Sequence, residues 1–262
     1  MASILRELFR RKKQPPLVCS ISLDDQGHPV GEDPNHKHTA ACFIDFEPLA
    51  VVELFQSQGC QACPPAIPGI MQGTNHPNLI LLTYNVTIFD HMGWKDTFAK
   101  AAWDQRQRAY AMRHQRKTIS TPQLFVNGVA HGSGAGDNEG VQELVQRARA
   151  AQMDKPWHIY LDVNDTDVKI DSDAEMVDEH DIILVLYKGG DEQVKIRSGS
   201  NKGVKFGHRN VVTDLVKVGK WSGGDTMLPL PASKDSMKPG ESAVVLVQEG
   251  GAGGPIVAVA KV

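Results

Sequence analysis

The sequence lacks several features that would place it at once in a special class of protein. It has no run of 18 apolar residues, so it predicts no transmembrane helix. Its four cysteines among 262 residues are too few for a disulfide scaffold. A net charge of −3 gives no overall attraction to nucleic acid. With 41% hydrophobic residues, the composition is that of a soluble globular protein.

Two of the cysteines form a C-x-x-C motif, Cys60 to Cys63, which is the most informative feature that is present. The motif follows an apolar run over residues 49–55 and is expected to open a helix. Two intervening residues let the sulfurs meet, and the partial positive charge of a helix N-terminus stabilises a thiolate. The pattern predicts a redox pair in which Cys60 attacks a disulfide and Cys63 resolves the mixed disulfide.

A metal site is the alternative interpretation of the same two cysteines. A structural zinc site usually needs two further ligands with similar local spacing, and the sequence has no second C-x-x-C. The spacing of His36, His38 and Cys42 matches no common ligand pattern. We therefore assign no metal ligands, but we keep a soft-metal (Cu or Zn) thiolate binder as an alternative function, because thiolates favour soft metals.

A second local signal lies at residues 119–128, where a Thr121-Pro122 step leads into a short apolar strand. Proline is tolerated as the first residue of a strand, because no donor is needed there. Asn127-Gly128 suits the positive φ angles of a type I′ turn. The segment therefore predicts a β-hairpin that begins at a proline.

The order of these patterns predicts two folded domains. Residues 48–153 alternate strand and helix in the order β, C-x-x-C helix, β, helix, proline-led hairpin, helix. Residues 154–262 carry seven short strand patterns separated by turns, which predicts an all-β sandwich. The predicted fold is therefore an α/β domain followed by a separate β-sandwich domain.

Residues 1–47 are predicted to be a basic helix and a polar extension outside these domains. The amphipathic pattern at residues 3–13 could lie on an anionic membrane surface, although we favour contact with the protein itself or a sister subunit. The sequence shows no signal-peptide pattern, so we expect a cytoplasmic protein, with the mitochondrion as the alternative compartment. Cys19 and Cys42 are then expected to be free thiols.

The C-x-x-C region and several later motifs together resemble a known family. It is a thioredoxin-like family of unknown function whose bacterial members are often described as secreted proteins. The resemblance spans roughly residues 48–262 and implies a thioredoxin-like fold for the α/β domain. The motifs that carry it are Val51–Cys63, Asp90–Asp96, Arg106–Tyr110, Thr121–Gln123, Gly207–Val212 and Gly219–Trp221.

The resemblance also implies roles for residues outside the C-x-x-C motif. In thioredoxin-like proteins a cis Thr-Pro bond faces the cysteine pair, which makes Pro122 a catalytic residue and puts Thr121 against the substrate. A buried acid beneath the cysteines can relay protons, and Glu53 would take that role unless it is a satisfied acid at a strand edge. Asp90 and Trp94 are expected to bind substrate at the rim, although Trp94 could equally be a core aromatic residue.

Together these signals predict a thiol–disulfide oxidoreductase that needs no cofactor. Its partner would be a disulfide or thiol, on a protein or a small molecule, and no nucleic-acid partner is expected. The rival from a different class is a non-catalytic binding protein that keeps the fold as a scaffold and uses the β-sandwich as its contact surface. The soft-metal binder is the third interpretation.

Overall fold

The computed structural model describes residues 48–133, 138–231 and 237–262, which belong to one compact unit, Pro48–Val262. The predictions for the N-terminal extension, with its amphipathic segment and its two cysteines, lie outside the described residues. None of the described helices is long and apolar enough to cross a membrane.

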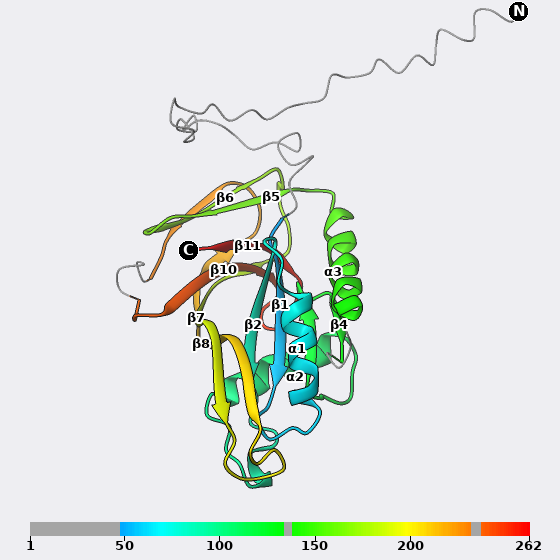
Figure 1. Ribbon diagram of the computed structural model, residues 1–262. Coiled ribbons are helices and arrows are strands. Elements are labelled where there is room, and N and C mark those ends of the chain that lie inside the picture. Colours follow the sequence, from blue (N-terminus) through cyan, green and yellow to red (C-terminus); the bar gives the residue numbers. More distant parts are fainter. Residues whose placement is uncertain (1–47, 134–137, 232–236) are drawn as a thin grey trace, which may run out of the picture. The chain divides into compact units, whose positions relative to one another are not determined.

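The described chain folds into three α-helices and two β-sheets (Figure 1). The helices are α1 (Cys63–Gly73), α2 (Ala101–Arg113) and α3 (Asn138–Met153), and a 3-10 helix, η2, covers Asp90–Met92. The larger sheet has eight strands in the order β11 (Ile256–Lys261), β10 (Glu241–Glu249), β7 (His180–Lys195), β8 (Lys205–Trp221), β2 (Leu79–Asn85), β1 (Ala50–Gln56), β3 (Gln123–Val126) and β4 (Ala130–Gly132). The smaller sheet has the order β5 (Ile159–Val163), β6 (Asp167–Ser172) and β9 (Thr226–Pro229).

The predicted division into a thioredoxin-like α/β domain and a separate β-sandwich is wrong. Strands from both predicted domains share the eight-stranded sheet, because β8 lies parallel to β2 and pairs with it at Thr83 and Val211. Side chains reinforce this junction: Asn210 Nδ2 donates to the carbonyl of Leu81 at 2.9 Å, and Thr83 Oγ1 donates to the carbonyl of Arg209 at 2.5 Å. The predicted order of elements in residues 50–153 is present, but these elements form one flank of a mixed sheet.

Strand β1 lies inside this sheet and is buried on both faces. Successive side chains of a strand point to opposite faces, so β1 contributes to two hydrophobic cores. Val52 and Leu54 pack with residues of α1 and α3, whereas Val51 and Phe55 pack in the opposite core with Trp103 of α2. Strands β7 and β10 also contribute to this second core, so the sheet curls around it.

The smaller sheet covers the other face of β7 and β10 and closes a third core. Apolar side chains alternate along its strands with polar ones that face solvent. The residues that meet in this core are Leu161, Val168 and Ile170 from the smaller sheet and Ile182, Leu184, Val245 and Val247 from the larger one. The two sheets therefore form a local sandwich within one compact unit.

A buried ion pair crosses the second core. Glu53 of β1 accepts a hydrogen bond from Arg106 Nε at 2.7 Å, and the two side chains are 0% and 3% exposed. The hydroxyl of Tyr110 also donates to the Glu53 carboxylate. Gln248 of β10 accepts from Arg106 at 3.1 Å and donates to the Tyr110 hydroxyl at 3.1 Å. This network joins β1, α2 and β10.

Replacing Glu53 by Gln should destabilise the protein by about 3–5 kcal/mol, because Arg106 then keeps a buried charge without a partner. Urea unfolding of the purified protein measures this change. Glu143→Gln is the matched control, because its pair with Arg147 is exposed and should contribute less than about 1 kcal/mol. Equal, small losses in the two variants would contradict the importance of the buried pair.

Candidate active site

The C-x-x-C motif lies in the connection between β1 and α1. Strand β1 ends at Gln56 and α1 begins at Cys63, so Cys60 precedes the helix by three residues. The amide of Cys60 donates to the carbonyl of Ser57 at 3.1 Å, and the amide of Cys63 donates to that of Cys60 at 3.4 Å. Both cysteines are free and buried, at 4% and 0% exposure. The expected helix start therefore fits Cys63, whereas Cys60 lies in the turn before it.

The pKa values of the two thiols are shifted in opposite directions. A hydrogen bond from the Cys63 thiol and further ones from the backbone of Ala62 and Cys63 lower the pKa of Cys60 to about 6, against the opposing effect of burial. Burial raises the pKa of Cys63 far above its usual value, and the neighbouring Cys60 raises it further. At neutral pH the site therefore holds one thiolate, on Cys60, and one thiol, on Cys63.

The Thr121–Pro122 step lies against this turn. Its peptide bond is cis, and Pro122 is buried. In its protonated form, the Cys60 thiol donates to the carbonyl oxygen of Thr121, which lies 3.2 Å from Cys60 Sγ. The structure thus brings Cys60 and Cys63 together with the predicted Thr-Pro step, although Thr121 lies 61 residues beyond Cys60 in the sequence.

Glu53 does not belong to this group. The β1 residues that pack with the cysteines are Val52 and Leu54, and Glu53 points to the opposite face of the sheet. Its carboxylate is held there by Arg106. The structure therefore does not bring Glu53 together with the cysteines, because the parity of the strand directs its carboxylate to the other core. A proton relay from Cys63 to Glu53 stays a prediction.

Gln58, two residues before Cys60, organises the loop and was not predicted from the sequence. Its backbone N–H donates to Asp96 Oδ2 at 2.7 Å, and its side-chain oxygen accepts from Trp94 Nε1 at 2.8 Å. Asp96 is 4% exposed and also accepts from the side chain of Asn85 at 2.9 Å. Burial raises the pKa of Asp96, while its hydrogen bonds lower it. The sequence does not indicate these contacts of Gln58, because a polar residue in a loop follows no periodic pattern.

The predicted substrate residues Asp90 and Trp94 lie beside Asp96 and Gln58. The amide of Asp96 donates to Asp90 Oδ1 at 3.0 Å, so Asp90 supports Asp96. Trp94 is partly buried against the core that contains both cysteines, and its indole nitrogen is bound to Gln58. Both residues therefore hold the loop that precedes Cys60, and contact with substrate stays a prediction.

The β7–β8 hairpin supplies two further contacts to the thiol loop. Asn201, in the turn of the hairpin, donates from Nδ2 to the carbonyls of Gln58 and Cys60, both at 2.8 Å. His208 of β8 lies with its Nε2 at 3.2 Å from the side-chain nitrogen of Gln58. Burial lowers the pKa of His208 to about 4, so the imidazole is neutral and accepts from Gln58. Asn201 was missed, because no local pattern distinguishes it from other turn residues.

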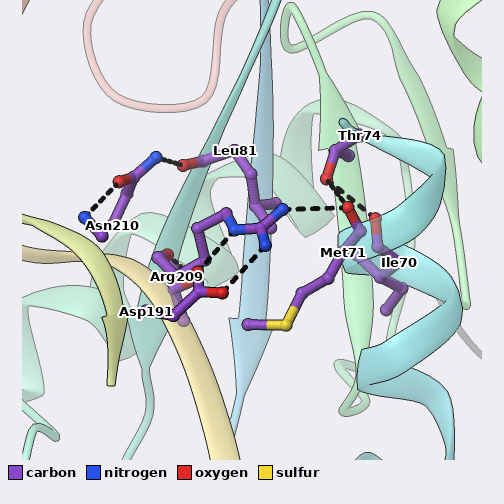
Figure 2. Close-up of polar contacts among 9 residues, drawn as sticks. Ile70, Met71, Thr74, Leu81, Asp191, Arg209 and Asn210 are labelled. Carbon is purple, nitrogen blue, oxygen red and sulfur yellow. Dashed lines mark hydrogen bonds and ion pairs between the residues drawn. The ribbon is translucent and has the colours of Figure 1, made fainter. Parts of the chain in front are cut away.

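The two residues after His208 anchor β8 to the rest of the sheet (Figure 2). Arg209 donates to both carboxylate oxygens of Asp191, at 2.6 and 2.9 Å, and to the carbonyl of Met71 near the end of α1 at 3.0 Å. Asn210 bonds the carbonyl of Leu81 on β2. The three consecutive residues His208, Arg209 and Asn210 thus contact the thiol loop, helix α1 and strand β2.

A cavity of about 640 Å³ lies beside this anchor, lined by residues that include Thr74, His76, Tyr187, Arg209 and Lys261. Thr74 caps the end of α1 that is opposite to Cys63. Because α1 has 11 residues and a helix rises about 1.5 Å per residue, roughly 16 Å of helix separate the cavity from the thiols. The cavity is therefore no part of the thiol site.

Within the part of the chain that the structure describes, no three His, Cys, Asp or Glu residues are grouped so that they could hold a metal ion. Among these described residues, the C-x-x-C motif offers a metal ion two thiolates as ligands, which suit a soft ion such as Cu(I).

The chain belongs to the family described as "Protein of unknown function (DUF1223)", which matches residues 51–248. It is similar to a crystal structure of a protein from Agrobacterium tumefaciens, with 28% identity, 83% of this chain and 95% of that chain covered, and a TM-score of 0.65. HBP35 of Porphyromonas gingivalis shares the fold at 12% identity, with 83% and 75% covered and a TM-score of 0.56. No curated protein matches the chain. Membership of a family of unknown function is thus confirmed.

The buried His208 should make the protein less stable as the pH falls from about 6.5 to about 4. The unfolded chain takes up a proton on this imidazole in that interval, whereas the folded protein, with its pKa of about 4, does not. The expected loss is up to roughly 3 kcal/mol. Urea unfolding across this pH range should show a shallower pH dependence for His208→Gln than for the wild type. The exposed His76 provides the control, since His76→Gln should leave the dependence unchanged.

Proposed function

We propose that the protein is a thiol–disulfide oxidoreductase that uses Cys60 and Cys63. The observation that carries this proposal is the placement of two free thiols in one turn, with Cys60 Sγ at 3.2 Å from the carbonyl oxygen of Thr121. The lowered pKa of Cys60, about 6, and the raised pKa of Cys63 support it. A thiolate present at neutral pH is the attacking species in disulfide exchange. The likeness to thioredoxin-like proteins, as we propose it, concerns the thiol site and not the architecture of the chain.

The exchange proceeds in two steps. The Cys60 thiolate attacks one sulfur of the partner's disulfide, forming a mixed disulfide and releasing the partner's other sulfur as a thiolate. Cys63 then loses its proton to that thiolate or to water and attacks Cys60 Sγ, which releases the second partner sulfur. The partner gains two electrons, and the protein holds a Cys60–Cys63 disulfide. An external dithiol returns the protein to its reduced form by the same steps in reverse.

The surrounding residues support this sequence of steps. Asn201 and Ser57 fix the backbone of Cys60, so the sulfur keeps its place beside Thr121. Cys63 is fully buried, which keeps it protonated until a mixed disulfide forms beside it. The carbonyl of Thr121 lies at hydrogen-bonding distance from Cys60 Sγ, where the backbone of an extended partner would pass.

Reduction of insulin with dithiothreitol as the donor tests the activity. The wild type should accelerate the reaction, and both Cys60→Ser and Cys63→Ala should abolish the acceleration. Cys19→Ser with Cys42→Ser is the matched control and should keep full activity. An inactive wild type, or wild-type activity in Cys60→Ser, would contradict the proposal. Copper bound to protein purified under reducing conditions, together with absent exchange, would favour the soft-metal binder instead.

The pH dependence of alkylation tests the assignment of the nucleophile. Iodoacetamide should react with the wild type with an apparent pKa of about 6, which belongs to Cys60. In Cys63→Ala the apparent pKa should rise toward the ordinary value of about 8.5, because the hydrogen bond from the Cys63 thiol is the largest lowering effect. Peptide mapping identifies the modified cysteine. Faster labelling of Cys63 than of Cys60 at neutral pH would reverse the assignment.

A further inference from the structure

The hairpin that reaches the thiol loop is strongly basic. Residues 193–207 contain four cations and no Asp or Glu, although the whole chain has a net charge of −3. The four cations are Lys195, Arg197, Lys202 and Lys205, and all four are exposed. We call these four side chains the cationic tip of the β7–β8 hairpin.

Two members of the cationic tip oppose each other across the hairpin. Lys195 of β7 and Lys205 of β8 are direct cross-strand partners. Like charges in this arrangement are destabilising, so the pair does nothing for the hairpin itself. None of the four cations forms an ion pair with any residue that the structure describes. The nearest acids in sequence are already occupied, since Asp191 pairs with Arg209 and Glu192 with Lys188.

The cationic tip adjoins the thiol site. Asn201, the neighbour of Lys202, bonds the carbonyl of Cys60. Lys205 and Gly207 lie on the same face of β8, because they are two residues apart. This face packs close to α1, the helix that begins at Cys63, since a Cβ atom on Gly207 would lie 3.8 Å from Ile67. In Figure 1 the turn between β7 and β8 lies at the bottom of the view. In this turn Ser198 Oγ donates to the carbonyl of Gly93, the residue after η2, at 2.6 Å.

We propose that the cationic tip is the docking surface for an acidic polypeptide segment that carries the disulfide exchanged at Cys60. The proposal rests on the proposed function for its redox part. Lys195 and Lys205 occupy the facing ends of β7 and β8, and Arg197 and Lys202 lie in the connection between these strands, so four positive charges gather on one hairpin. All four side chains are exposed, as docking of a polypeptide partner requires. Several carboxylates on one segment match this pattern of charges.

Binding of cysteine-free peptides tests the docking surface without any redox step. Three fluorescent peptides of equal length differ only in a run of four Glu, four Gln or four Lys, and fluorescence anisotropy reports their binding to the full-length reduced protein. The Glu peptide should bind at least roughly tenfold more tightly than the Gln peptide at low ionic strength, and the preference should fade at high salt. The Lys peptide should not bind.

The variant Lys195→Gln/Lys205→Gln should lose most of this preference, and its melting temperature should not fall, because a like-charge pair is removed. The variant Arg108→Gln/Lys261→Gln removes the same charge elsewhere on the surface and should bind like the wild type. Both residues are exposed and have no ion pair with a residue that the structure describes. Equal losses in the two variants, or equal binding of the Glu and Lys peptides, would overturn the proposal. So would hairpin-dependent binding of a single-stranded oligonucleotide with no binding of the Glu peptide.

Disulfide-containing versions of the Glu and Lys peptides then connect docking to chemistry. Single-turnover oxidation of the reduced protein should be about tenfold faster with the Glu peptide, and the hairpin variant should remove this difference. Exchange at equal rates with both peptides would overturn the docking surface alone. Binding preference without any exchange would overturn the proposed function and leave the basic surface as a binding site.

Discussion

The burial of strand β1 on both faces is the constraint on which the rest of the structure depends. A strand with no solvent-exposed face must assign each side chain to one of two cores, and the parity of the residue number decides which. Val52 and Leu54 pack in the same core as the cysteines, whereas the Glu53 side chain lies in the other core and needs a buried cation there. Arg106 meets that need, so the ion pair and the thiol site are two results of one strand position.

The thiol site is composite, because its loop is held from both halves of the chain. Asp96 and Trp94 bind Gln58 from the segment that follows β2, and Asn201 and His208 bind the same loop from the β7–β8 hairpin. Each contact is a buried or partly buried hydrogen bond to a loop that lacks regular pairing of its own. The strands that the sequence assigned to a separate sandwich are thus needed to complete the surroundings of Cys60.

Local features of the site could be predicted from the sequence, and non-local ones could not. The C-x-x-C motif, the Thr121-Pro122 step and the order of strands and helices in residues 50–153 depend on neighbours in the chain, and periodicity and turn residues indicate them. The pairing of Val211 with Thr83 depends on a partner more than a hundred residues away, for which no local pattern exists. The face chosen by Glu53 follows from a one-residue difference in parity, and the sequence alone does not say which face the cysteines share.

The position of Asn201 has a consequence for the newly made chain. Asn201 is 141 residues beyond Cys60, so the ribosome synthesises the thiol loop long before this hydrogen-bonding partner. At about 5–20 residues per second, this interval lasts roughly 7–30 seconds. Throughout it, two neighbouring cysteines are accessible without the hairpin that later covers their backbone. The order of synthesis thus exposes Cys60 and Cys63 to oxidation and to metal ions before the site that controls them exists.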